Sequence, residues 1–110
     1  MKAILVPIDK EAEDRIKNGD ESESDVIIIF FNDDDYYELW KTPFYFEINK
    51  KIQAGIDDGE SAVVSGKEDL TALYSIIDEY EKKIYNSIVY SLKSLTVAAI
   101  RFDTSVQFYY

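Results

Sequence analysis

The chain alternates between short apolar stretches and longer segments in which apolar residues recur every three or four positions. The short stretches, which are rich in β-branched residues or alternate between apolar and polar positions, are typical of strands and lie at 3–7, 25–31, 61–65, 94–102 and 105–110. The longer segments are typical of amphipathic helices and lie at 10–17, 43–54 and 67–85. We therefore predict one α/β or α+β domain over residues 1–110, with a central sheet of about four to five strands.

The strongest strand signal is the sequence DVIIIFF at 25–31. It contains six consecutive apolar residues, Val26 to Phe31, and four of them are β-branched. A continuous apolar run is typical of a strand that is buried on both faces. We expect this strand at the centre of the sheet, followed by a turn at 32–35, where Asn and Asp side chains bond to their own backbone.

Two helices are indicated by their periodicity and caps. The segment 10–17 follows Asp9, a favourable N-cap, and is ended by Asn18-Gly19. The segment 67–85 carries one apolar stripe, in which residues such as Leu70 and Ile77 recur at steps of three and four. Its charged residues fall off that stripe, so we expect them on the solvent side.

The segment 43–54 fits two structures. Thr42 followed by Pro43 is a typical helix start, and Ile48 and Ile52 stand four positions apart on one helical face. The letters PFYFEIN also alternate well enough for a strand. We favour the helix, and the strand remains open.

The last two predicted strands are separated only by Asp103 and Thr104. Their sequences, SLTVAAIRF at 94–102 and SVQFYY at 105–110, are rich in β-branched and aromatic residues. A two-residue connection between such segments is typical of a hairpin, so we expect them to pair with each other.

The composition excludes several kinds of chemistry. The chain has no Cys and no His, so disulfides, zinc–thiolate sites and His-dependent catalytic triads are impossible within it. The acidic runs at 33–35 and 57–60 lack the alternate-position spacing of a calcium loop. Glu47 and Lys50 lack the spacing of a carboxylate-metal nuclease. We therefore expect no catalytic, metal or cofactor site, and no enzymatic activity.

The charge of the chain is strongly acidic and unevenly spread. It has 22 Asp and Glu against 12 Lys and Arg, a formal net charge of −10. Residues 9–38 alone hold 12 acids and 3 bases. Solubility alone explains a net charge of this size. Its concentration within thirty residues, however, also indicates an acidic interaction face.

Aromatic residues stand directly beside the Asp run. Packing beneath the following helix explains part of this group, but Tyr and Trp are also the most frequent anchors of protein interfaces. Because neighbours in an extended segment point to opposite faces, we expect one of Tyr36 and Tyr37 in the core and the other at the surface. The candidate partner-binding residues are Asp20, Glu21, Glu23, Asp33, Asp34, Asp35, Tyr36, Tyr37, Glu38 and Trp40.

The charge also limits the partners and the location. A field this negative disfavours direct binding to nucleic acid and to anionic membranes, so we expect a basic protein partner and a monomer or weak dimer. The opening MKAILVPIDK lacks the apolar core and cleavage site of a signal peptide, and no apolar run approaches the length of a membrane span. We therefore expect a cytoplasmic protein.

A small, acidic α/β chain without Cys or His resembles the bacterial immunity proteins that neutralise nuclease toxins, such as those of colicin and contact-dependent growth inhibition systems. The resemblance covers the whole chain but concerns size and charge, and no motif carries it. It implies an inhibitor whose acidic residues at 20–25 and 33–38 pair with Lys and Arg of a toxin, while Tyr36, Tyr37 and Trp40 fill the dry centre.

Two other functions remain open. The composition also resembles that of phage DNA-mimic inhibitors, the anti-restriction and anti-CRISPR proteins. Duplex DNA carries one charge per ~1.7 Å of axis, so nine net charges imitate only about 15 Å of it, which suits a single active-site cleft better than a long DNA site. The third possibility is a structural or adaptor domain without an inhibitory role.

Overall fold

The computed structural model describes residues 2–110 and consists of one α+β domain, as the sequence predicts. A 3₁₀ turn, Glu23–Asp25, precedes the second strand. In chain order the helices and strands are β1 (Lys2–Pro7), α1 (Lys10–Asn18), β2 (Val26–Phe31), α2 (Asp33–Trp40), α3 (Phe44–Ile52), β3 (Ser61–Ser65), α4 (Lys67–Glu81), α5 (Ser87–Phe102) and β4 (Ser105–Tyr109).

The four strands form one sheet in the order β2-β1-β4-β3, and every neighbouring pair is antiparallel. The last strand along the chain, β4, therefore lies between β1 and β3. In the centre of the sheet Ile4 stands opposite both Ile29 and Phe108. The strands β2 and β3 form the two edges.

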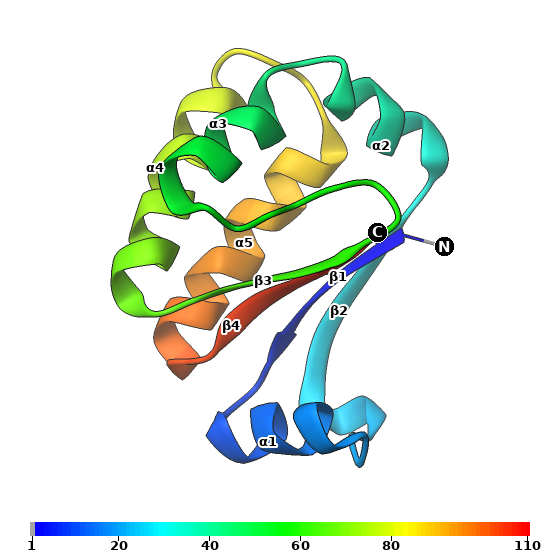
Figure 1. Cartoon of the computed structure of the whole chain (residues 1–110), viewed down its shortest axis with the longest axis vertical. Coiled ribbons are helices and arrows are strands. Elements are labelled where there is room, and N and C mark those ends of the chain that lie inside the picture. Colours follow the sequence, from blue (N-terminus) through cyan, green and yellow to red (C-terminus); the bar gives the residue numbers. More distant parts are fainter. Residues whose placement is uncertain (1) are drawn as a thin grey trace.

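The helices lie unequally on the two faces of the sheet. Figure 1 shows α3, α4 and α5 stacked on one side, α2 beyond one end of the sheet, and α1 apart from them at the opposite end. The core lies between the sheet and the helices α2 to α5, where Val6 and Phe108 of the sheet are buried with Leu73 of α4 and Leu92 of α5.

Most of the predicted elements are confirmed. Strands occur at 3–7, 61–65 and 105–110, and helices at 10–17 and 67–85, although α4 already ends at Glu81. The segment 43–54 is a helix and not a strand. Pro43 precedes the first helical residue, and the buried residues Phe44, Tyr45 and Ile48 give it one apolar face.

The prediction of a strand at 94–102 is wrong, because these residues belong to α5. Residues Ile88, Leu92, Leu95 and Ala99 recur at steps of three and four, and all four are buried. That helical period outweighs the β-branched residues that suggested a strand. The expected hairpin is therefore absent. Asp103 instead ends the helix in the left-handed conformation, with a φ of 55°.

The strand at 25–31 is confirmed, but its expected central place is wrong. It lies at the edge of the sheet, and its first residue, Asp25, belongs to the preceding 3₁₀ turn. Ile27, Ile28 and Phe30 are exposed, since the helices cover little of this edge. Residues 33–35, expected in a turn, form the first turn of α2 instead, whereas the side chain of Asn32 bonds to the nearby backbone as expected and caps the helix.

Candidate functional site

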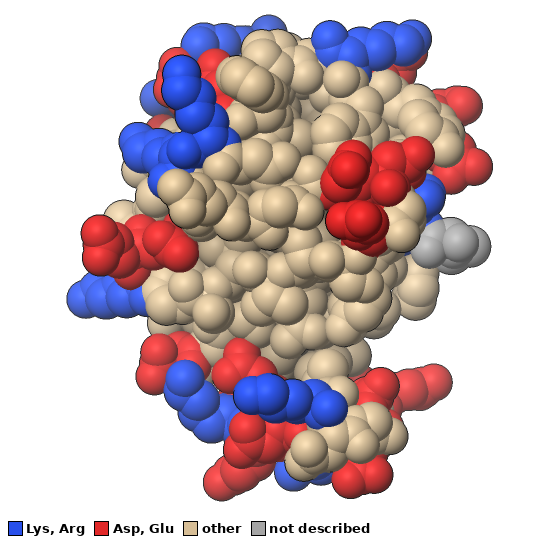
Figure 2. Space-filling model, viewed as in Figure 1, with Lys and Arg blue, Asp and Glu red and all other residues tan. Residues whose placement is uncertain are grey.

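The acidic residues singled out in the sequence lie in two places. Asp20, Glu21 and Glu23 belong to the segment between α1 and β2, whereas Asp33, Asp34, Asp35 and Glu38 belong to α2. The whole of β2, a strand about 20 Å long, separates the two groups. On the face seen in Figure 2, acidic side chains form separate groups with uncharged surface between them. The two acidic groups therefore lie at opposite ends of β2.

The Asp run has a structural role at the start of α2. Asn32 caps this helix, because its side-chain oxygen accepts a hydrogen bond from Asp35 N at 3.0 Å. Asp33, Asp34 and Asp35 form the first turn, where carboxylates are stabilised by the helix dipole. Asp35 also accepts hydrogen bonds from Ser87 through its carboxylate and from Asn86 through its carbonyl oxygen, which joins α2 to the start of α5.

The three aromatic candidates differ in exposure. Tyr36 is fully buried and Tyr37 is half exposed. One core and one surface residue were expected, but the cause is a helical segment and not an extended one. Trp40 is half-buried against the core, with its ring 4.3 Å from that of Tyr45. Its indole Nε1 is buried without a hydrogen-bond partner among the described residues. Tyr36 is thus not placed to contact a partner.

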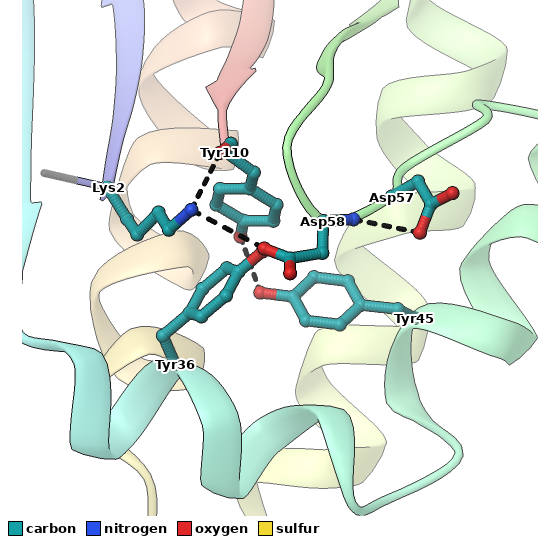
Figure 3. Close-up of polar contacts among 6 residues, drawn as sticks. All are labelled: Lys2, Tyr36, Tyr45, Asp57, Asp58 and Tyr110. Atoms are coloured by element: carbon teal, nitrogen blue, oxygen red, sulfur yellow. Dashed lines mark hydrogen bonds and ion pairs between the residues drawn. The ribbon is translucent and has the colours of Figure 1, made fainter.

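Tyr36 belongs to a polar cluster that closes the core at one end of the sheet (Figure 3). Its hydroxyl donates to Asp58 Oδ1 at 2.5 Å. Lys2 Nζ lies 3.4 Å from the same oxygen and donates to the carbonyl oxygen of Tyr110 at 2.8 Å. The hydroxyls of Tyr45 and Tyr110 are hydrogen-bonded to each other. The cluster thus connects residues from β1, α2, α3, the loop before β3 and the end of β4.

The side chains of this cluster form hydrogen bonds in protonation states that folding stabilises. Burial raises the pKa of Tyr36, Tyr45 and Tyr110 well above that of a free phenol, and in Tyr36 the bond to Asp58 adds to this effect. The same bond, with help from Lys2, holds the pKa of Asp58 below its ordinary value. The phenols therefore stay protonated at neutral pH and take part in hydrogen bonds, not in proton abstraction.

The opposite face of the sheet offers a different kind of site, which we call the open face. Helix α1 covers one end of it, where Ala12 is fully buried and Ser105 Oγ donates to Glu13 at 2.7 Å. Along β2 the uncovered remainder is apolar, whereas along β3 Val63 lies between the exposed Ser61 and Ser65. Phe30 is 57% exposed there and Val63 54% exposed. The large apolar side chains of this surface are Val26, Ile28, Phe30, Val63 and Tyr109.

Two hollows follow the open face on either side of α1. The larger, of about 760 Å³, is bordered by Ile28, Phe30 and Tyr109 from the sheet and by Glu21 and Glu23. The smaller, of about 380 Å³, lies against β3 and β4. Of the charged residues around the two hollows, four are acids and one is a lysine: Glu13, Asp14, Glu21, Glu23 and Lys17. The open face is therefore an apolar surface with an acidic rim.

An internal ion pair holds the segment 19–25, which we call the acidic loop, against α1. The guanidinium of Arg15 donates two hydrogen bonds to the carboxylate of Asp25, from Nε at 2.9 Å and from Nη2 at 2.7 Å. Ser22 N donates to the same carboxylate at 3.0 Å. Together these bonds lower the pKa of Asp25 to about 2, with the bond from Arg15 contributing most. The acidic loop is thus fixed beside the larger hollow.

This ion pair predicts a loss of stability in acid. A carboxyl group whose pKa is lowered by folding stabilises the native state above its ordinary value of 3.8, and this contribution disappears as the pH falls towards 2. We expect Asp25→Asn to lower the melting temperature at pH 7 and to flatten its decrease between pH 4 and pH 2. Asp14→Asn is the control, since Asp14 has no ion-pair partner among residues 2–110. Equal slopes for both variants in calorimetry would contradict the prediction.

The residues of the open face were missed in the sequence as a site, although a signal was present. The run from Val26 to Phe31 carries apolar residues on both faces of the strand, and only the helix-facing set contacts the core. A contiguous group of exposed apolar side chains indicates a surface for another molecule. The sequence shows apolar residues on both faces of this strand, but it does not reveal which face lacks a covering helix.

Comparison of the chain with protein-family models, curated proteins and solved structures finds no match. Within residues 2–110, no helix combines the length and apolarity needed to cross a membrane. No three acidic side chains of this part of the chain converge as a metal site requires.

Proposed function

We propose that the chain is an acidic protein-binding domain that inhibits a basic partner by covering it, as an immunity protein covers a toxin. On this proposal it acts in the cytoplasm, without catalysis of its own. The observation that supports it is the open face, where exposed apolar side chains such as Ile28 and Phe30 lie beside Glu21 and Glu23. Apolar centres with polar rims are the usual anatomy of protein interfaces.

The charge selects the kind of partner. With a net charge of −10, the chain attracts basic proteins over a distance and repels phosphate-rich molecules. Steering of this kind raises the association rate by roughly 10- to 1000-fold and weakens as salt is added. A toxin that binds nucleic acid has the complementary basic surface, which is why an immunity role fits better than that of an adaptor.

The arrangement of the acids favours this role over DNA mimicry. A DNA mimic presents regular rows of negative charge along one surface, because duplex DNA carries one charge per ~1.7 Å of axis. Here β2 separates Asp33 and Asp34 from the acidic loop, and the surface between them includes Ile28 and Phe30. An interface with an apolar centre and acidic ends fits a protein partner better.

The proposal is tested with variants of two exposed aromatic residues. The partner is crosslinked in cells that carry the gene, identified, and then produced separately so that binding is measured between purified proteins. We expect Phe30→Glu on the open face to weaken binding by at least about tenfold, because it places a charge in an apolar centre. Tyr85→Glu, between α4 and α5, is the matched control and should bind as the unaltered chain does. Equal affinities of both variants, or an acidic partner, would refute the proposal.

A further inference from the structure

The free edge of β2 has a defined hydrogen-bonding pattern. Ile8 N donates to Asp25 O at 3.0 Å, and these two residues stand opposite each other in the extension of the β1–β2 register. Hydrogen-bonded and non-bonded pairs alternate along an antiparallel ladder, so Ile27, Ile29 and Phe31 bond to β1. The N–H and C=O groups of Val26, Ile28 and Phe30 therefore point away from the sheet.

This edge lacks the features that usually prevent strands from pairing with other chains. Natural edges are protected by Lys, Pro, bulges, short length or a covering element. The other edge strand, β3, begins and ends with serine, so only its three central residues are apolar. By contrast, β2 is six residues long, entirely apolar and paired regularly along its whole length with β1. It is the part of the sheet best suited to accept a further strand.

The charges at the two ends of β2 identify the occupant. The acidic loop precedes the strand, and Asp33 and Asp34 follow it, both exposed. A second copy of this chain paired along β2 would bring acids against acids at both ends, whether the strands ran parallel or antiparallel. Like charges that face each other across an interface destabilise the complex. A strand with an apolar centre and basic ends meets no such repulsion.

We infer that β2 binds a β-strand of the basic partner, which extends the sheet to five strands and is flanked by Lys or Arg at both ends. This inference rests on the proposed function, because it names how the partner engages the open face. The main-chain groups of Val26, Ile28 and Phe30 supply the hydrogen bonds. The side chains of these residues belong to the open face, so the added strand lies directly beside the larger hollow.

The inference is tested by amide hydrogen exchange of the whole chain with a synthetic peptide. The peptide has lysines at both ends and alternating valine and threonine between them. In the free protein we expect fast exchange at Ile28 and Phe30 and slow exchange at Ile27 and Ile29. When the peptide occupies nine-tenths of the sites, exchange at Ile28 and Phe30 should slow by about tenfold. No slowing at these two amides, with or without peptide binding elsewhere, overturns the inference.

Two matched peptides separate the contribution of the main-chain hydrogen bonds from that of the lysine charges. In the first, methyl groups replace the amide hydrogens that face β2, which removes the bonds to the carbonyls of Val26, Ile28 and Phe30. In the second, glutamates replace the lysines. We expect neither to protect Ile28 or Phe30. If these amides exchange slowly in the free protein, and more slowly still as the protein concentration is raised, the occupant is a second copy of the chain. That result would refute the basic strand.

Variants of Ile28 distinguish this inference from the proposed function. Ile28→Pro removes an N–H that faces away from β1, a position at which edge strands tolerate Pro. Ile28→Val keeps the N–H and is the control. With the purified partner, we expect Ile28→Pro to bind at least tenfold more weakly than the unaltered chain, and Ile28→Val to bind as the unaltered chain does. If Phe30→Glu loses binding while Ile28→Pro, shown by its circular dichroism to be folded, does not, strand addition is refuted and the proposed function stands.

Discussion

Replacing Trp40 by alanine is expected to lower the free energy of unfolding by about 3 kcal/mol, the lower end for removal of a large aromatic residue from a core. The indole is half-buried and packs on Tyr45 with 4.3 Å between ring centroids, while Tyr36 lies edge-on at 6.3 Å. Removing it would leave a cavity between α2 and α3. Denaturant unfolding followed by circular dichroism measures the loss.

The matched variant is Trp40→Phe, and it should change the stability by no more than about 1 kcal/mol. Phenylalanine fills part of the same space and removes Nε1, which is buried without a partner among the described residues. Because Trp40 is the only tryptophan, its emission in the free protein should be blue-shifted and resistant to quenchers. Emission typical of an exposed indole, with an unchanged stability of Trp40→Ala, would place this residue at the surface after all.

Removing either hydroxyl of the buried pair Tyr45 and Tyr110 is expected to cost about 1–3 kcal/mol, because the remaining hydroxyl is left without its partner. The double variant Tyr45→Phe with Tyr110→Phe should be more stable than the sum of the two single losses predicts. It leaves no unpaired hydroxyl, and both rings still pack in place. Guanidinium unfolding of all four proteins gives the coupling energy.

A coupling energy near zero would contradict this interpretation of the pair. Tyr37→Phe provides the control, since its side chain is half exposed and water can replace any bond that it loses. This variant should be within about 0.5 kcal/mol of the unaltered protein. The comparison separates the effect of burial from that of removing a hydroxyl in general.

Local patterns in the sequence predicted much of the fold. The caps at Asp9 and Gly19 correctly bounded α1, and the stripe through Leu70 and Ile77 identified α4. The pattern failed in α5, where Thr96, Val97 and Ile100 suggested a strand. There the tertiary packing of Leu92 and Leu95 outweighs the local preference for a strand.

The candidate site was harder to predict, because its features depend on contacts between distant residues. No local pattern indicates that Tyr36 meets Asp58, or that Tyr45 meets Tyr110. The Asp run was interpreted as part of an interaction face, but it also has a local cause at the N-terminus of α2. The apolar run at β2 was recognised, yet its position at an edge follows from the order of the whole sheet.

The position of β4 between β1 and β3 has a consequence for how the domain is assembled. The first two strands are separated only by residues 8–25, so the loop that must close before they pair is short. In contrast, Lys2 and Tyr110, which are bonded in the native state, lie 108 positions apart in the sequence. Pairings of such long range slow folding, since a large loop must close before they form. Until β4 enters, β1, an almost entirely buried strand in the native protein, has an open edge of its own. Whenever β1 is paired with β2 alone, its other edge is free, and a free apolar strand edge is where pairing with another chain competes with folding.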